Sequence, residues 1–206
     1  MVGHQAAGPL AEVAPDHPAA RVHDAAGSRR VGSHRTRTPR VTTGTDRSGM
    51  DAEEYLTVVA RALDGMAGIA RELGDDGVNL RAPVRGANSA FALVAHCLGV
   101  CEYWLGSLVA GRDVVRDRDA EFTATGSLAD LEARLAASRS RIRADVAAYR
   151  PGAPLAAPAD PRFSAAGDET MTQDGVLLHV LEELAQHHGQ LEVLRDVLAG
   201  GEAGTR

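Results

Sequence analysis

A carboxylate and an imidazole stand four residues apart near the end of the chain, at Glu183 and His187. In an α-helix this spacing places both side chains on one face, one turn apart. The same face carries Val180, Leu184, Leu191, Leu194 and Leu198. We therefore expect Glu183 and His187 to point into a protein core, where an unpaired carboxylate is costly and a divalent cation would offset that cost.

A second imidazole, His96, lies on an earlier apolar segment and faces inward by the same helical periodicity. Two small residues, Ala92 and Gly99, flank it and leave space beside the ring. Together with Glu183 and His187 it forms a His2Glu set with an open coordination position. Such a set predicts a catalytic-type metal site, with zinc favoured and nickel, iron or manganese as alternatives. The other interpretation is a set of ordinary core or surface histidines and a plain salt bridge.

Four helices must position these residues. Their apolar side chains recur at helical spacing, Ser89 and Ser127 are typical N-cap residues, and Asp130 completes a weak capping box. The expected helices span residues 51–73, 88–110, 128–149 and 171–199. The expected loops are 74–87, 111–126 and 150–170, all long for a bundle. Because β-strand patterns are nearly absent, we predict an all-α four-helix bundle at residues 50–200, followed by a flexible tail at 201–206.

Residues 1–49 differ from the rest of the chain in composition. They carry 7 arginines and 4 acidic residues, a net charge of +3, with a single leucine and no isoleucine or aromatic residue. Such a segment cannot bury enough apolar surface to offset its chain entropy, so we expect a disordered extension. We also expect it to be dispensable for folding, with the functional chain starting near Met50.

The overall charge and composition exclude several classes of function. A formal net charge of −6 argues against general binding to nucleic acid or to an anionic membrane. Aromatic residues make up only 3% of the chain, which leaves no stacking platform for single-stranded nucleic acid. No run approaches the roughly 18 apolar residues needed to cross a bilayer. The two cysteines, Cys97 and Cys101, are expected to be buried, reduced thiols in a cytoplasmic protein.

The segment His-Val-Leu-Glu-Glu-Leu-Ala-Gln-His-His-Gly-Gln-Leu-Glu-Val-Leu-Arg, from His179 to Arg195, resembles the last helix of the DinB-like metal-binding four-helix bundles. Its Glu-x3-His form is most similar to the mycothiol-dependent branch, which includes maleylpyruvate isomerase and mycothiol transferases. The segment Asn88–His96 is similar to the second helix of that family, which carries a single ligand histidine. The resemblance covers about residues 50–200.

This resemblance implies that His96, Glu183 and His187 are metal ligands. Many relatives have a His-x3-His pair instead, so the glutamate marks the subgroup. The implied bundle is up-down-down-up, with its second and third helices running the same way. That topology agrees with the long connection at 111–126.

The resemblance also implies an enzyme in which the metal binds the thiol of a small sugar-linked cofactor, such as mycothiol, and lowers its pKa. The thiolate then attacks an electrophilic small molecule, so the protein is a thiol transferase or isomerase. We expect His179, or an acid of the segment 112–121, to assist proton transfer. We expect Arg116 and Arg118 to contact the cofactor, although a solvated loop is the simpler interpretation of that charged segment.

Two other functions stay open at this point, a metal-assisted hydrolase and a non-catalytic, metal-stabilised dimeric module. The second predicted helix favours a homodimer, because apolar residues also lie on its side opposite His96. They are Phe91, Val94, Cys97, Leu98, Cys101, Leu105 and Leu108. We further expect Tyr103 and Trp104 to pack in the core and His188 to be exposed.

Overall fold

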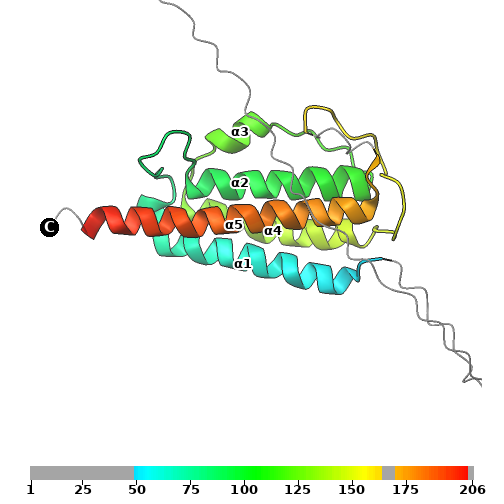
Figure 1. Cartoon of the computed structure of the whole chain (residues 1–206), viewed down its shortest axis with the longest axis horizontal. Helices are drawn as coiled ribbons and strands as arrows, with labels where there is room; N and C mark the ends of the chain where they lie inside the picture. The colour runs from blue at the N-terminus through cyan, green and yellow to red at the C-terminus, as the bar shows by residue number, and fades with distance from the viewer. Residues whose placement is uncertain (1–48, 164–169, 204–206) are drawn as a thin grey trace, which may run out of the picture. The chain divides into compact units, whose positions relative to one another are not determined.

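The computed structural model describes residues 49–163 and 170–203. Nearly all of the predicted disordered extension, and residues 204–206 of the predicted tail, lie outside the described residues. Four long helices pack into a bundle (Figure 1), which confirms the predicted all-α fold. They are α1 (Ala52–Gly77), α2 (Ala90–Cys101) continued by the π-helix η1 (Glu102–Val109), α4 (Leu128–Val146) and α5 (Gln173–Ala203). Among the described residues the only β-type pairing is an isolated bridge between Pro154 and Thr172.

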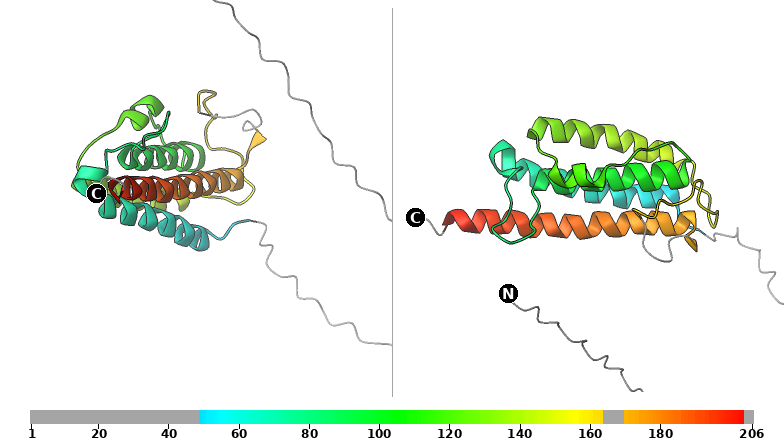
Figure 2. Two further views of the ribbon diagram at one scale, coloured as in Figure 1. Left: turned by 60° about the vertical axis from the view of Figure 1, so that its left-hand side comes forward. Right: turned by 90° about the horizontal axis from the view of Figure 1, so that it is seen from above.

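The long helices run up-down-down-up, with α1 and α5 pointing one way and α2 and α4 the other (Figure 1 and Figure 2). Two ion pairs show these directions. Arg195 near the end of α5 meets Glu72 near the end of α1 at 3.4 Å, so this pair is parallel. Arg71 near the end of α1 meets Glu132 near the start of α4 at 2.6 Å, so this pair is antiparallel.

The helix starts follow the capping signals in the sequence. Asp51 accepts hydrogen bonds from the backbone of Glu53 and Glu54 at the start of α1. Ser89 caps α2, and Ser127 forms a reciprocal capping box with Asp130 at the start of α4. Each cap satisfies backbone N–H groups that have no partner within the helix.

Three predicted helix ends are wrong. The helix α4 ends at Val146 rather than at residue 149. The helix α1 continues past Gly74 to Gly77, with a kink where Gly74 has a φ of 64°. The helix α5 continues through Gly200 and Gly201 to Ala203. A glycine inside a helix costs about 1 kcal/mol relative to alanine, which lowers helix stability without ending the helix.

The predicted loop 111–126 contains a helix that the sequence did not indicate, α3 (Arg118–Thr123), capped by Asp117. With six residues and no fully buried side chain, α3 is too short to show a helical period. Because α2 and α4 are parallel, the chain must return along the bundle between them, and α3 forms on this return path. We call residues 110–127 the crossover. It packs α3 against α2 (Figure 1).

The core lies between the four long helices. Its largest fully buried side chains include Leu63, Met66, Leu93, Trp104, Leu131, Leu184 and Leu191. The continuous segment Ala90–Val109, with a mean hydropathy of 1.4, is long and apolar enough to cross a membrane, contrary to the sequence estimate. However, 83% of that window is buried inside the bundle, so core packing accounts for its apolar composition.

The apolar side of α2 that favoured a homodimer is covered by its own chain. All seven side chains named for it are buried, with Leu98 the most exposed at 8%. In a plain bundle each helix has two neighbours, whereas α2 packs against α4, α5 and α3 (Figure 2). Because all seven side chains are buried within one chain, this side of α2 does not need a second copy of the chain to cover it.

Candidate metal centre

The three predicted metal ligands meet between α2 and α5. The carboxylate Oε2 of Glu183 lies 3.5 Å from Nε2 of His96 and 3.3 Å from Nε2 of His187. One ligand atom from each of the three residues lies within 4.8 Å of the other two. The helical spacing of Glu183 and His187 produces one half of this cluster, and the antiparallel packing of α2 on α5 supplies the other.

The carboxyl group of Glu183 is ionised at neutral pH. Hydrogen bonds from His187 and His96 lower its pKa well below the ordinary value of 4.5, and they outweigh the opposing effect of burial. Its side chain is 26% exposed, so this negative charge lies at the edge of the core rather than deep within it. An ionised carboxylate in this position is a suitable ligand for a divalent cation.

The ring of His96 is almost fully buried and has a second carboxylate partner. Its Nδ1 lies 2.8 Å from Oε2 of Glu121, which comes from α3. Burial lowers the pKa of His96, but the hydrogen bonds to Glu121 and Glu183 outweigh it and raise that pKa above 6.5. Burial likewise raises the pKa of Glu121, but hydrogen bonds from His96 and Arg116 outweigh it and lower that pKa.

Arg116, predicted to contact a cofactor, has an internal partner. Its Nε lies 2.8 Å from Oε1 of Glu121 and its second terminal nitrogen 2.9 Å from Oε2, a two-pronged ion pair. The Arg116 side chain is only 4% exposed. Its guanidinium also lies 5.1 Å from the ring centre of Phe163. Pairing with Glu121 therefore uses the two neighbouring N–H groups with which Arg116 would bind an incoming ligand.

A cavity of about 340 Å³ opens beside the three ligand residues. Its lining includes His96, Trp104, Arg118, Phe122, Phe163, His179, Glu183 and His187. A neighbouring groove of about 800 Å³ shares His179, Glu183, Gln186 and Phe163 with it. Small-molecule sites are typically concave, and this one combines aromatic walls with an unusually large share of charged and polar side chains.

The candidate proton carrier, His179, lies where the cavity and the groove join. Its Nε2 is 3.9 Å from Oε1 of Glu183, which is an ion-pair distance rather than a hydrogen bond. Its ring packs against Trp104 with centroids 4.1 Å apart. Trp104 is fully buried, as predicted, and also lines the cavity.

Arg118 and Arg162 lie at the same cavity. Arg118 places its guanidinium 5.2 Å from the ring centre of Phe122, and none of the ion pairs found among the described residues includes it. Arg162, in contrast, is paired with Asp160 at 2.6 Å. Of these two arginines, Arg118 is thus the better candidate to receive an anionic or polar group.

Sequence reasoning missed several residues of this site, above all Glu121 as a partner of His96, together with Phe122, Arg162 and Phe163. All of them lie on the crossover or on the segment before α5, both of which were assigned as loops. The unusual length of these connections was the one available signal, since long connections in compact domains are often functional.

Two lesser predictions have opposite outcomes. Cys97 and Cys101 are buried free thiols, as expected, and burial raises the pKa of Cys101 to about 12. His188 was expected to be exposed, but it is partly buried and its ring packs over Gly65 of α1. The absence of a side chain on Gly65 creates the space that the ring occupies.

The donor set fits a divalent cation. In both histidines Nδ1 faces a side-chain oxygen that can accept its hydrogen bond. This oxygen belongs to Glu121 in the case of His96 and to Gln190, at 3.0 Å, in the case of His187. Both therefore direct Nε2 toward the Glu183 carboxylate. Metal-binding histidines almost always have such an outer partner, which fixes the ring and its tautomer.

None of the curated proteins compared with the chain matches it. The family model described as mycothiol-S-transferase matches residues 54–200, from the first turn of α1 to the last turn of α5, and so includes all three candidate ligands. The chain therefore belongs to the mycothiol-S-transferase family.

Proposed function

We propose that this protein is a metal-dependent S-transferase that activates mycothiol, or a similar low-molecular-weight thiol, for attack on an electrophilic small molecule. The observation that carries this proposal is the convergence of His96, Glu183 and His187 at the wall of a ligand-sized cavity. Membership of the mycothiol-S-transferase family supports a thiol as the co-substrate.

His96, Glu183 and His187 would hold the cation through two nitrogens and one oxygen. With three protein ligands a position stays open, and a divalent cation there lowers the pKa of a bound thiol, so that thiolate is available at neutral pH. We favour zinc, with nickel, iron or manganese as alternatives, because imidazole and carboxylate ligands suit all four. We place the reaction in the cytoplasm, where thiols stay reduced.

His179 Nε2 is placed to take the proton that the thiol loses. It faces the Glu183 carboxylate at 3.9 Å, which would stabilise the resulting imidazolium. The sulfur electron pair then forms the new S–C bond with the electrophile. With an activated alkene as acceptor, His179 returns its proton to the carbon that has become a carbanion, so the reaction is balanced. Elimination of the thiol from such an adduct would make the same site an isomerase.

Arg118 and the aromatic walls would bind the rest of the two substrates. The guanidinium of Arg118 offers hydrogen-bond donors to the hydroxyl and amide oxygens of a sugar-linked thiol. The rings of Phe122 and Phe163 give the cavity apolar sides. The neighbouring groove, which shares His179 and Glu183 with the cavity, provides room for the electrophile.

The test combines metal analysis with a conjugation assay. The purified protein is stripped of metal, reloaded with Zn²⁺, and mixed with a low-molecular-weight thiol and an activated alkene. We expect turnover only when both metal and thiol are present. Metal-dependent turnover of an ester without thiol would instead indicate a hydrolase, and bound metal without any turnover would indicate a non-catalytic module.

Two variants on α5 make a matched pair for this assay. Glu183→Gln removes a negative charge from the cluster, whereas Glu192→Gln removes one from an exposed position of the same helix. We expect Glu183→Gln to lose metal and turnover together, and Glu192→Gln to retain both. Full zinc-dependent turnover in Glu183→Gln would contradict the proposed site.

A further inference from the structure

We propose that Glu121 is a positioning residue, which holds His96 in the tautomer and orientation that metal binding requires. This inference rests on the proposed metal site, because it assigns a role to a residue that does not belong to the ligand set. The starting observation is that both ring nitrogens of His96 face a carboxylate. Nδ1 lies 2.8 Å from Glu121 and Nε2 lies 3.5 Å from Glu183.

These two carboxylates compete for the single proton of a neutral imidazole. The nitrogen that carries the proton donates a hydrogen bond, and the other nitrogen presents a lone pair. A metal on the Glu183 side needs the lone pair on Nε2, so the proton must be on Nδ1. The shorter contact of His96 with Glu121 favours this arrangement, and His96 is then ready to bind a cation beside Glu183.

Glu121 is itself held in place by a buried partner. Arg116 makes two contacts with the carboxylate, at 2.8 and 2.9 Å, and the two side chains are only 4% and 10% exposed. Hydrogen bonds between charged groups are stronger where water is excluded. The chain Arg116–Glu121–His96 therefore fixes the carboxylate before any metal arrives.

The surface of α2 is shaped to admit this carboxylate. A Cβ built on Gly99, one turn after His96, would lie 2.5 Å from Cδ of Glu121, closer than real Cβ atoms come to other atoms. Only a glycine lets the Glu121 side chain cross α2 at this point. The next residue, Phe122, stacks on the face of the His96 ring with centroids 4.4 Å apart. Two successive residues of α3 thus hold the edge and the face of one imidazole.

A purely structural role for Glu121, the docking of α3 on the bundle, is the competing explanation. The crossover has other attachments at its far end, however. Asn79 exchanges two hydrogen bonds with the backbone of Gly126, and Asp75 accepts one from the backbone of Leu128. Loss of Glu121 should therefore change the environment of His96 more than the position of the crossover.

The experiment measures two properties of the full chain. The first is the affinity for Zn²⁺ alone, obtained by competition with a chromogenic chelator. The second is the tautomer of His96 in the metal-free protein, obtained from its ring nitrogen chemical shifts at alkaline pH. The tautomer needs no metal and no activity, and a residue that only docks α3 would not change it.

We expect Glu121→Ala to weaken zinc binding about 10–100-fold and to shift the His96 proton from Nδ1 to Nε2. Glu121→Gln, which can still accept the Nδ1 hydrogen bond but carries no charge, should lie between Glu121→Ala and the wild type. Gly99→Ala should act in the same direction as Glu121→Ala, because its methyl group displaces the carboxylate.

Two control variants separate this role from general effects. Asp119→Asn removes a negative charge from an exposed position of α3. Gly68→Ala adds a methyl group to a helical glycine that has open space around it. We expect both to keep the zinc affinity and the His96 tautomer of the wild type.

The outcomes distinguish this inference from the proposed function. If the wild type binds zinc and Glu121→Ala binds it equally well with the proton still on Nδ1, the positioning role is wrong but the metal site stands. If the wild type binds no zinc, both are wrong. Should Glu121→Ala fail to fold, Glu121→Gln and Gly99→Ala decide by the same two measurements.

Discussion

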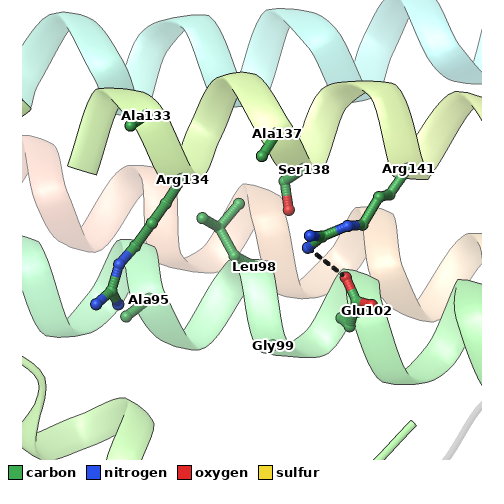
Figure 3. Close-up of a pocket in the computed structure, with 9 residues that line it drawn as sticks. All are labelled: Ala95, Leu98, Gly99, Glu102, Ala133, Arg134, Ala137, Ser138 and Arg141. Carbon is green, nitrogen blue, oxygen red and sulfur yellow. Dashed lines mark hydrogen bonds and ion pairs between the residues drawn. The ribbon is translucent and has the colours of Figure 1, made fainter. Parts of the chain in front are cut away.

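The two sides of α2 are both buried but differ in what they bury. Toward α5 and α3 the helix presents His96, whose ring meets two carboxylates and an aromatic ring. Toward α4 it lines a groove of about 490 Å³ with small and apolar residues, shown in Figure 3. In that groove Ala95, Leu98 and Gly99 face Ala133 and Ala137, and Arg141 at one end pairs with Glu102 at 3.4 Å.

The difference shows where chemistry can be placed on an apolar helix. Facing α4, small side chains leave an open groove, and the charged groups that line it, such as Glu102 and Arg141, pair with each other. Facing α5, a buried imidazole must be satisfied, and residues from two other elements converge to do so. Substitutions on the two sides should therefore separate metal binding from stability.

The largest expected effect comes from the ligands themselves. Loss of an outer hydrogen-bond partner of a ligand typically lowers metal affinity about 10–100-fold. We expect Glu183→Gln and His187→Ala to lower zinc affinity by more than this. The reason is that His187→Ala removes one donor atom from a set of three, and Glu183→Gln replaces the charged carboxylate of another ligand by a neutral amide. Elemental analysis of the purified variants measures this loss, and unchanged metal content in both would rule out the assigned site.

The second prediction concerns pH. Metal binding requires His96 to be deprotonated, and hydrogen bonds to Glu121 and Glu183, opposed by burial and by Arg116, raise its pKa above 6.5. Protons therefore compete with the metal at a higher pH than for an ordinary histidine. We expect zinc affinity, measured by chelator competition, to fall as pH decreases through this raised pKa. A fall that begins only well below pH 6.5 would contradict the prediction.

Without metal the same groups set the stability of the bundle. The raised pKa of His96 means that its stabilisation is complete below the unfolded value of 6.5 and is lost as pH rises through the folded value. The lowered pKa of Glu183 means that its stabilisation is present above the unfolded value of 4.5 and is lost as pH falls. Thermal unfolding of the metal-free protein should therefore show greatest stability between these two values.

The next prediction tests the side of α2 that faces α4. Leu98 is 8% exposed and lines the groove, so Leu98→Ala should lower the free energy of unfolding by about 2–4 kcal/mol. Zinc affinity should stay at the wild-type level, because the residue does not contact the ligand cluster. Chemical denaturation and chelator competition on the same sample measure the two effects. A parallel loss of affinity would show that the two sides of α2 are coupled.

The smallest effect is expected for His188→Ala. His188 follows a ligand directly in sequence, but its ring packs over Gly65 rather than toward Glu183. Loss of this partly exposed packing should cost about 1 kcal/mol of stability and leave zinc binding unchanged. Thermal unfolding with and without zinc measures both, and a drop in zinc affinity as large as that of His187→Ala would show that the wrong histidine was assigned.

Much of the fold follows from local signals in the sequence. The N-caps Ser89 and Ser127 form as predicted because capping depends on a few neighbouring residues. The inward direction of His96, Glu183 and His187 also follows, since helical periodicity fixes which side chains of one helix share a face. The ends of α1 and α5 were less predictable, because a glycine only lowers helix stability and its surroundings decide whether the helix continues.

The sequence by itself determined the four long helices, their inward faces and the identity of the three candidate ligands, because each is encoded within a few turns of one helix. Only the tertiary structure decided that Glu121 and Phe122 hold the ring of His96, that Arg116 is engaged by Glu121, and that α2 is covered on its third side. The contacts with His96 join residues about 25 positions apart, and Arg116 meets Glu121 across the start of a helix too short to show a period. They arise because two parallel helices require a crossover, and the path of that crossover is set by the packing of the whole bundle rather than by its own residues.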